Sequence, residues 1–375
     1  MKVILKSLGL VVLVFFLSVV VLLSNIAGVE NAGHYRGLGL LIDEYNDVVN
    51  YPGNPAAGVV NAGSFETIQE AIDFARGNGF NVVQLEGKTY NINTSILLYS
   101  GMTLQGVSGR TFISMIGVNK PVIKHYGSIA GYTVIRDLTV TGDVTQSANT
   151  GIVLNDYYST IDNVTVANVG GHGIEFSTEG ASSTLIENKV INCMVRNAQD
   201  VSYYFGADDN VVLTDGSLLN CVSQGSGDNL AVVIGSGGGW LIDGLHVYNH
   251  HGTSIPVYIR GGYNTTLTNV YIEGFQAYAI QFGACQLNVN ISNINIITTD
   301  ENAVGIFAFD ASSEFGFDCN VNIANVSVFN SSSDGLDIIA GMPYKMKIKA
   351  VNLNATGSRA TNAVSLDMDD VVEIP

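Results

Sequence analysis

The sequence is poor in charged residues for its length. Lysine, arginine, aspartate and glutamate make up only 13% of its 375 residues, and the 33 acidic residues outnumber the 16 basic ones. The formal net charge is therefore −17 at pH 7. Such a surface repels nucleic acids and other anionic polymers unless cations intervene. We therefore expect no nucleic-acid partner.

Proline, tryptophan and cysteine are also scarce, with 6, 1 and 4 residues respectively. The cysteines form no C-x-x-C pair and no Cys/His cluster, which argues against a structural zinc site. Four cysteines allow three complete pairings or remain as buried thiols, and both alternatives stay open. Plentiful β-branched and aromatic residues argue against disorder. The composition is typical of a long all-β protein whose outer faces are polar but uncharged.

The first 28 residues have the pattern of a leader. Lys2 and Lys6 precede an apolar run over residues 8–23. This pattern fits a secretory signal peptide, and its length is at the lower edge for a membrane-spanning helix. Residues 1–28 are thus either a signal peptide or a retained N-terminal anchor, and the rest of the protein is secreted or held at the cell surface. Membrane contact is expected only through residues 8–23, if the leader is retained.

An internal repeat is the strongest signal in the chain. Its template has six positions. The first, fourth and sixth are aliphatic, the third is Asn, Asp or Gly, and the second and fifth are any residue, with single mismatches tolerated. The spacing between successive matches is 24 to 32 residues. The third position of the template falls at Asp137, Asn163, Asn192, Asn220, Gly244, Asn269, Asn293, Asn325 and Ala350.

Each repeat also has a second short strand before the template, as at residues 151–154, 173–176 and 279–282. Short strands joined by Asn- and Gly-rich turns at this period indicate a single-stranded right-handed parallel β-helix. Asparagine suits the turn because it tolerates left-handed backbone angles. At a coil spacing of about 4.8 Å, the chain from about residue 83 supplies about eleven coils.

The domain is expected to span residues 62–375, after an N-terminal extension over residues 29–61. Residues 64–77 form an amphipathic pattern with Ser64 as a candidate N-cap and Gly77 at the end. An open end of a β-helix exposes unpaired strand edges, so this helix is predicted to cap the N-terminal coil. The sequence has no compact cap at the other end, which raises the hypothesis of self-association at the C-terminal coil.

The order IQEAIDFA, GNGFNVVQLEGKTYNI and ILLYSGMTLQGVSG resembles the N-terminal module of the pectate-lyase-like superfamily, in the branch of rhamnogalacturonases and epimerase-type pectate lyases. The resemblance covers about residues 62–110. It implies a right-handed parallel β-helix and activity on a polysaccharide or other glycan. The superfamily also holds surface proteins without known activity, so the fold alone does not assign a reaction.

The predicted outward positions of the second strand form a row along the coils. They are Val153, Glu175, Tyr204, Val233, Tyr258, Gln281, Ala308, Asp337 and Asp367. Glycoside hydrolysis needs two carboxylates, whereas a lyase needs a base beside a uronate and a cation to neutralise charge. The candidate catalytic residues are Glu175, His172, Arg260, Asp208 and Asp209.

The candidate substrate-binding residues are Tyr204, Tyr258, His250, His251 and Trp240. No cofactor is required by this interpretation and no dedicated metal site is predicted, but Ca²⁺ could be held by the oxygens of Asp208, Asp209 and Asp228. Polygalacturonase-like enzymes carry Asp-Asp before Gly-His-Gly. Here Gly171-His172-Gly173 comes first, so their catalytic assignment is not carried over.

Two classes of function remain. The first is an exported carbohydrate-active protein that cleaves a polysaccharide, as a lyase or glycosidase, or binds it along the coil face, with epimerisation as a variant. The alternative is a non-catalytic surface or structural rod. In that alternative His172 and Asp208-Asp209 are turn residues and Glu175 is a solubilising charge. N-x-Ser/Thr sequons, whose use as glycosylation sites stays open, occur at Asn93, Asn163, Asn264, Asn290, Asn325, Asn330 and Asn354.

Overall fold

A computed structural model of the protein describes residues 58–177, 184–206, 212–225, 229–235, 237–250, 252, 255–259, 264–275, 278–282, 288–298, 305–310, 319–330, 336–341, 346–356 and 364–368. The predicted leader and most of the predicted N-terminal extension lie outside these residues. Within the described residues, no helix has the length and apolar character needed to cross a membrane.

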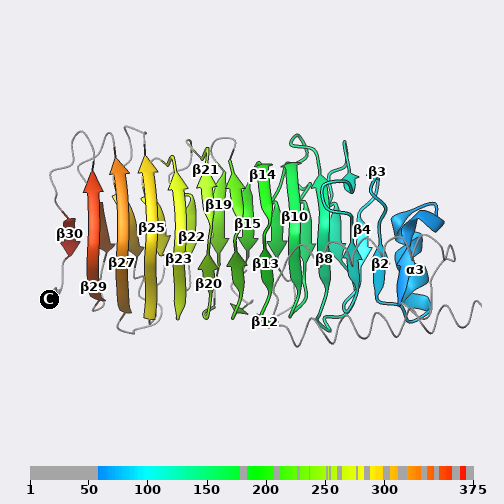
Figure 1. Ribbon diagram of the computed structural model, residues 1–375, viewed down its shortest axis with the longest axis horizontal. Coiled ribbons are helices and arrows are strands. Elements are labelled where there is room, and N and C mark those ends of the chain that lie inside the picture. The colour runs from blue at the N-terminus through cyan, green and yellow to red at the C-terminus, as the bar shows by residue number, and fades with distance from the viewer. Residues whose placement is uncertain are drawn as a thin grey trace, which may run out of the picture. The chain divides into compact units, whose positions relative to one another are not determined.

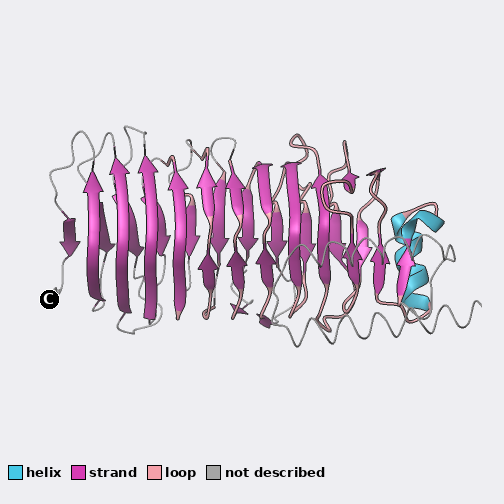
Figure 2. Cartoon of the chain, in the orientation of Figure 1, coloured by secondary structure: helices cyan, strands magenta, loops and turns pink. Residues whose placement is uncertain are grey.

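Strands make up most of the described chain, and they stack in two long parallel sheets (Figures 1 and 2). The larger sheet has 17 strands. They are β1 (Val59–Asn61), β2 (Val82–Gln84), β3 (Thr89–Asn91), β5 (Thr103–Gln105), β6 (Phe112–Ser114), β8 (Val134–Thr141), β10 (Thr160–Val169), β13 (Lys189–Ile191), β14 (Met194–Ala198), β17 (Ser217–Leu219), β18 (Val222–Gln224), β20 (Leu241–Asp243), β21 (His246–Tyr248), β23 (Thr265–Glu273), β25 (Asn288–Thr298), β27 (Cys319–Asn330) and β29 (Met346–Thr356).

The smaller main sheet has 11 strands, which pair in chain order. They are β4 (Ile96–Leu98), β7 (Ile123–His125), β9 (Ile152–Leu154), β11 (Ile174–Phe176), β15 (Val201–Phe205), β19 (Leu230–Ile234), β22 (Val257–Ile259), β24 (Tyr278–Phe282), β26 (Gly305–Asp310), β28 (Leu336–Gly341) and β30 (Val364–Met368). A third sheet pairs β12 (Thr184–Ile186) with β16 (Val212–Thr214).

The chain alternates between the two main sheets, so that β8, β9, β10 and β11 belong to the larger, smaller, larger and smaller sheet in turn. Each strand pairs in parallel with the strand one coil away. This is a parallel β-solenoid of the right-handed type, with about eight turns, and it confirms the predicted all-β class. The larger sheet splits some coils into two strands, so strand number does not equal coil number. The count of eleven coils stays a prediction.

The repeated template position is the bend within the larger sheet. Its backbone is left-handed at Asn163, with φ of 53°, and at Asn192, Asn220, Asn269, Asn293 and Asn325, where φ lies between 52° and 54°. The side chains also bond from coil to coil, as Asn293 Nδ2 donates to Asn269 Oδ1 at 3.2 Å and Asn325 Nδ2 to Asn293 Oδ1 at 3.1 Å. The prediction that the template asparagines, Asn163 among them, are turn residues is confirmed.

The interior of the solenoid is filled by alternate strand residues. In β10, for example, Ile161 and Val166 are fully buried. Burying one such side chain stabilises the fold by roughly 1.5–3 kcal/mol. Cys193 and Cys221 also face inward, and both are free thiols, which fits the buried-thiol alternative for these two cysteines. Burial, with Cys221 beside it, raises the pKa of the Cys193 thiol well above its ordinary value.

Among the described residues one α-helix, α3 (Ile68–Gly77), precedes β2, after a short 3-10 helix η1 (Ala62–Ser64). The predicted start at Ser64 is wrong because Thr67, not Ser64, is the N-cap: its hydroxyl accepts the Glu70 N–H at 3.1 Å. The predicted apolar face is confirmed, since Ile68, Ala71, Ile72 and Ala75 are all buried. The capping role of the helix stays a prediction.

The register of the smaller sheet defines one row of paired positions, which we call the outer row after half-buried members such as Glu175, Tyr204 and Tyr258. Val153 and Val233 in the same row are only 6% and 8% exposed. The row follows the prediction as far as Ala308 and then departs, because Ala308 aligns with Ile339 and not with Asp337. The outer row is Leu97, Lys124, Val153, Glu175, Tyr204, Val233, Tyr258, Gln281, Ala308, Ile339 and Asp367.

Candidate functional site

Glu175 and Tyr204 are direct neighbours in the outer row, on β11 and β15. The residues on either side of Glu175, Ile174 and Phe176, are fully buried, so the carboxylate points away from the core. Ser177 donates its hydroxyl to Glu175 Oε1 at 2.5 Å and fixes the carboxylate. The outward prediction for Glu175 is therefore supported by its geometry.

The ring of Tyr204 is held from two sides. It stacks on the imidazole of His172, with centroids 4.2 Å apart and planes inclined by 13°. It also lies against Gly206, where an added Cβ would come within 2.0 Å of the tyrosine ring. His172 lies just before β11 and Tyr204 within β15, so the stack joins neighbouring coils.

Asp200 completes this cluster. Its Oδ2 is 3.4 Å from His172 Nδ1, and the side chains of His172 and Asp200 are 18% and 62% exposed. The contact is a charge proximity, since His172 Nδ1 has no hydrogen-bond partner. No sequence motif marks Asp200, and the one signal for it is its place directly before β15, one coil from His172. We call His172, Glu175, Asp200 and Tyr204 the His172 cluster.

The second predicted tyrosine, Tyr258 on β22, is in the outer row but not beside Tyr204. Val233 of β19 lies between them and is 8% exposed. The backbones of Tyr204 and Tyr258 are therefore two strand spacings apart, or about 10 Å. The structure thus brings Tyr204, Glu175 and His172 together and leaves Tyr258 two coils away.

His250 and Trp240 lie in the interior. His250 is fully buried; its Nε2 is 3.0 Å from Ser223 Oγ and its Nδ1 is 2.6 Å from the Asn229 carbonyl. Trp240 is 1% exposed and donates Nε1–H to the Leu213 carbonyl at 3.2 Å. These placements argue against the predicted substrate contacts, because a glycan cannot reach buried side chains whose polar atoms are already bonded. A single sequence does not distinguish a loop histidine from one that folds inward.

The predictions for Arg260, Asp208, Asp209 and His251 fall outside the described residues, as does Asp228 of the suggested Ca²⁺ set. Among the described residues, no three His, Cys, Asp or Glu side chains form a metal-binding group. The outer-row neighbours of Glu175 are Val153 and Tyr204, so the row itself supplies no second carboxylate beside it.

A second histidine cluster, also missed from the sequence, lies on the larger sheet. His246 of β21 packs against Tyr248 and Tyr271, with ring centroids 4.9 and 4.8 Å away. Its Nε2 is 3.4 Å from Glu273 Oε1, and the two side chains are 38% and 42% exposed. Desolvation, with the Glu273 carboxylate next to it, raises the pKa of Tyr271.

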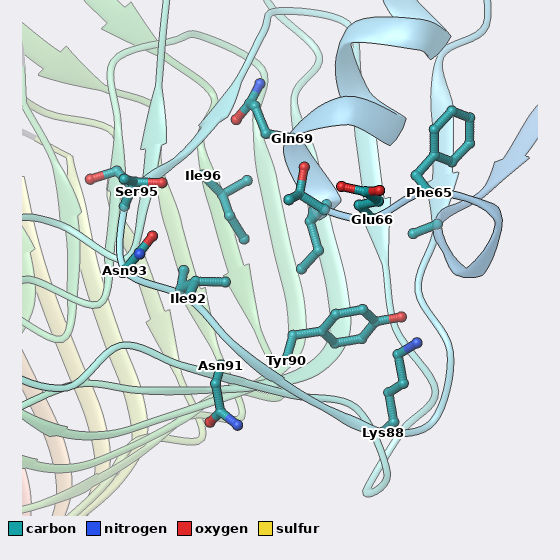
Figure 3. Close-up of a pocket in the computed structure, with 14 residues that line it drawn as sticks. Phe65, Glu66, Gln69, Lys88, Tyr90, Asn91, Ile92, Asn93, Ser95 and Ile96 are labelled. Carbon is teal, nitrogen blue, oxygen red and sulfur yellow. The ribbon is translucent and has the colours of Figure 1, made fainter.

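A polar cavity of about 300 Å³ lies near the N-terminal helix (Figure 3). It is lined by the start of α3 and by the segment from Lys88 to Ile96. Lys88 Nζ is 2.6 Å from Glu86 Oε2 and 4.9 Å from the centre of the Tyr90 ring. The lysine charge is thus paired, and the cavity offers a tyrosine, amides and hydroxyls.

The arrangement of strands, with a site on the outer face of a solenoid sheet, defines a parallel β-helix protein. Comparison with solved structures gives similar folds at low sequence identity. The A-module of a mannuronan C-5 epimerase from Azotobacter vinelandii aligns with a TM-score of 0.51 and 16% identity, over 79% of this chain and 99% of that one.

Two further structures are similar in the same way. The polygalacturonase from Erwinia carotovora subsp. carotovora aligns with a TM-score of 0.52 and 12% identity, over 84% of this chain and 96% of that one. The enzymatically active domain of tailspike protein 2 from bacteriophage CBA120 aligns with a TM-score of 0.55 and 13% identity, over 76% and 44%. The chain thus has the fold of the pectate-lyase-like superfamily, as predicted.

No protein-family model matches the sequence, and no curated protein matches it. The likeness to solved structures at these identities establishes the fold, and the function has to be argued from the site.

Proposed function

We propose that this protein binds a polysaccharide along the outer row and acts on it at the His172 cluster. The observation that carries the proposal is the stack of His172 on Tyr204, with Asp200 at the imidazole Nδ1. A fixed imidazole, a phenol and two carboxylates on an outward sheet face provide acid-base groups beside an aromatic surface. The proteins of similar structure include a mannuronan C-5 epimerase and a polygalacturonase, which supports a polysaccharide as the substrate class.

We further propose proton transfer, in a lyase or an epimerase reaction, in preference to hydrolysis. Hydrolysis needs two carboxyl groups about 5–9.5 Å apart across the scissile bond. The two carboxylates of the cluster are instead engaged by other groups, Glu175 by the Ser177 hydroxyl and Asp200 by the His172 imidazole. A histidine beside a carboxylate can instead accept a proton from the carbon next to a uronate carboxyl group. In this scheme Asp200 orients His172 at Nδ1, and His172 Nε2 accepts the proton from that carbon. Tyr204 then donates a proton to the opposite face of the same carbon in an epimerase reaction, or to the leaving glycosidic oxygen in a lyase reaction.

A uronate substrate needs its charge neutralised, since the chain itself carries a net charge of −17. Arg260 or a Ca²⁺ ion held near Asp208, Asp209 and Asp228 remains our proposal for that role. Hydrolysis by Glu175 with Asp208 or Asp209 is the competing chemistry.

A non-catalytic surface rod is the second candidate function. The observation that favours it is the burial of His250 and Trp240, which removes two of the predicted glycan contacts from the surface. Export by residues 1–28, a capping role for α3, eleven coils and self-association at the last coil are proposals that accompany either function.

An activity screen tests the proposal. The full chain is incubated with polygalacturonate, mannuronan and a neutral glucan, with and without Ca²⁺. New reducing ends, the ultraviolet absorbance of unsaturated uronates and the uronate epimer ratio by NMR are followed. We expect lyase or epimerase product, abolished in His172→Ala and unchanged in the matched control His246→Ala. Reducing ends without unsaturated product would favour hydrolysis, and no product with any substrate would favour the surface rod.

A further inference from the structure

Five tyrosines gather at one corner of the solenoid, in three successive coils near its N-terminal end. They lie just after β4, just after β7, just before β8, and between β9 and β10. Two of them are prominently exposed, Tyr126 at 53% and Tyr132 at 64%. We call this set the tyrosine corner, and it consists of Tyr99, Tyr126, Tyr132, Tyr157 and Tyr158.

Two of these tyrosines have a strained backbone. Tyr132 and Tyr158 have φ values of 69° and 55°, in the left-handed region that bulky side chains avoid. Non-glycine residues there cost about 1–3 kcal/mol each, and such strain gathers at functional sites. The strand register makes the two tyrosines equivalent to each other and to the following turn positions, which are Glu187, Asp215, Gly239 and Asn264. Glycine and asparagine suit the left-handed backbone at that turn position, and tyrosine does not. The presence of tyrosine there in two neighbouring coils therefore points to a role other than forming the turn.

The backbone on both sides of Tyr132 is held by the buried carboxylate of Asp156. Asp156 is fully buried, and its two oxygens accept hydrogen bonds from Gly131 N and Thr133 Oγ1, both at 2.7 Å. These partners are the residues immediately before and after Tyr132. The Tyr132 N–H also donates to the Tyr157 carbonyl at 3.0 Å. The loop is therefore fixed on both sides of an exposed ring.

The rings support one another. Tyr132 stacks on Tyr158 with centroids 5.2 Å apart and planes inclined by 15°, and Tyr157 meets Tyr158 edge to face at 5.2 Å. In the adjacent pair, Tyr99 and Tyr126 are 5.9 Å apart and inclined by 76°. Packed tyrosines offer a rigid surface with an apolar face and a polar edge, at little further entropic cost on binding.

The tyrosine corner is aligned with the His172 cluster. Tyr99 and Tyr126 are two residues beyond the outer-row positions of β4 and β7, and Ser177, which holds Glu175, has the equivalent place after β11. β7 and β11 are two strand spacings apart, or about 10 Å. A chain molecule lying along the solenoid axis over Glu175 would thus continue toward Tyr126.

We propose that the tyrosine corner is a glycan-binding site that holds a polysaccharide by stacking pyranose rings on Tyr126 and Tyr132. This inference rests on the proposed function, because the polysaccharide is the same molecule that reaches the His172 cluster. A pyranose ring has an apolar C–H face and hydroxyl edges, which complement an aromatic face with phenol groups at its rim. The site serves long chains, since only these span both clusters.

The test measures binding and folding separately. Migration of the full chain is compared in native gels with and without embedded polygalacturonate, mannuronan or a neutral glucan. The variants are Tyr132→Gly, Tyr126→Ala and Tyr132→Phe, with the exposed Phe329→Ala on β27 as the matched control. Glycine suits the left-handed backbone of Tyr132, so Tyr132→Gly is expected to keep or raise the unfolding midpoint while removing the ring.

We expect one polysaccharide to retard the wild-type protein, with apparent affinity lower by about tenfold in Tyr132→Gly and in Tyr126→Ala. Tyr132→Phe and Phe329→Ala should bind as the wild type does. Equal retardation of all variants, or turnover by the wild type without retardation, would overturn the tyrosine corner and leave the proposed function standing. No retardation and no turnover on any polysaccharide would overturn both. An oligomer in sedimentation velocity that Tyr132→Gly dissociates, with glycan binding unchanged, would assign the corner to contacts between copies of the chain.

Discussion

The imidazole of His172 stacks on the phenol ring of Tyr204, with their centroids 4.2 Å apart and their planes inclined by 13°. The two residues come from neighbouring coils, His172 from the segment just before β11 and Tyr204 from within β15. Solenoid stacking therefore converts two separate stretches of sequence into one contact. Asp200, whose Oδ2 is 3.4 Å from the imidazole Nδ1, gives the pair a third titratable neighbour.

The His172 cluster predicts an ordered series of activity losses. Removal of a general acid-base group lowers kcat by about 10²–10⁴-fold, so His172→Ala should lose most activity. Asp200→Asn should lose less, because it removes the orienting charge and keeps the side-chain volume. Product formation under saturating polysaccharide measures both. His246→Ala, at the other histidine cluster, is the control, and full activity of His172→Ala would contradict the assignment.

Burial of His125 predicts a pH-dependent stability. The pKa of His125 lies below its ordinary value of 6.5 because of burial, and the nearby Asp156 carboxylate only partly opposes the shift. Its Nε2 is 3.8 Å from Asp156 Oδ2 and 2.9 Å from Ser100 Oγ. The unfolded chain takes up the proton first, so the free energy of unfolding falls as pH drops below about 6.5 toward the folded pKa.

Urea unfolding of the wild type and of His125→Gln between pH 5 and pH 8 measures this dependence. The variant should be less stable at pH 8, since it disturbs a buried hydrogen-bonded group, and its stability should vary less between pH 6.5 and pH 5. His246→Gln, at a histidine that is 38% exposed, is the matched control. An unchanged slope in His125→Gln would assign the pH dependence to other groups.

The asparagine ladder predicts a difference between two small substitutions at one position. Asn163 has φ of 53°, and its Nδ2 donates to Asp137 Oδ1 at 2.7 Å. Asn163→Ala loses the hydrogen bond and strains the backbone, and should cost about 1–3 kcal/mol. Asn163→Gly loses only the hydrogen bond and should cost less. Equal denaturation midpoints for the two variants would show that backbone strain has no part in the ladder.

The two buried thiols should be unreactive in the folded protein. Burial raises the pKa of Cys193, and the neighbouring Cys221 is also fully buried, so little thiolate is present at neutral pH. Alkylation with iodoacetamide at pH 8, followed by peptide mass spectrometry, should leave Cys193 and Cys221 unmodified in the native protein and modify both in denaturant. Rapid native modification of Cys193 would mean that this coil opens locally.

The repeat was readable from the sequence because each coil uses the same bend. Asn163, Asn192 and Asn220 all need a left-handed backbone, and few residue types accept one, so the spacing of asparagines records the coils. The outward place of Glu175 and Tyr204 follows from strand alternation alone. The shift from Asp337 to Ile339 was not readable, because strand register over long variable connections depends on pairing.

The candidate site was only partly predictable for a related reason. Asp200 and the tyrosine corner combine residues from different coils, and nothing local in the sequence marks them as neighbours. Trp240 follows a glycine-rich stretch and His250 lies in a polar connection after β21, which favours exposure. Their side chains nevertheless fill the interior and bond to the Leu213 carbonyl and to Ser223. A loop position says where the backbone runs and does not decide where a large side chain packs.

The sequence by itself determined the coil period, the all-β class, the inward and outward alternation and the scarcity of charge, because each depends on residues close together in the chain. Only the tertiary structure decided which side chains of neighbouring coils come into contact. That choice placed His172 on Tyr204, aligned Tyr126 with Ser177 and fixed Tyr132 between two bonds to Asp156. Such contacts depend on register between coils, which is set by the packing of the whole interior and not by any single repeat.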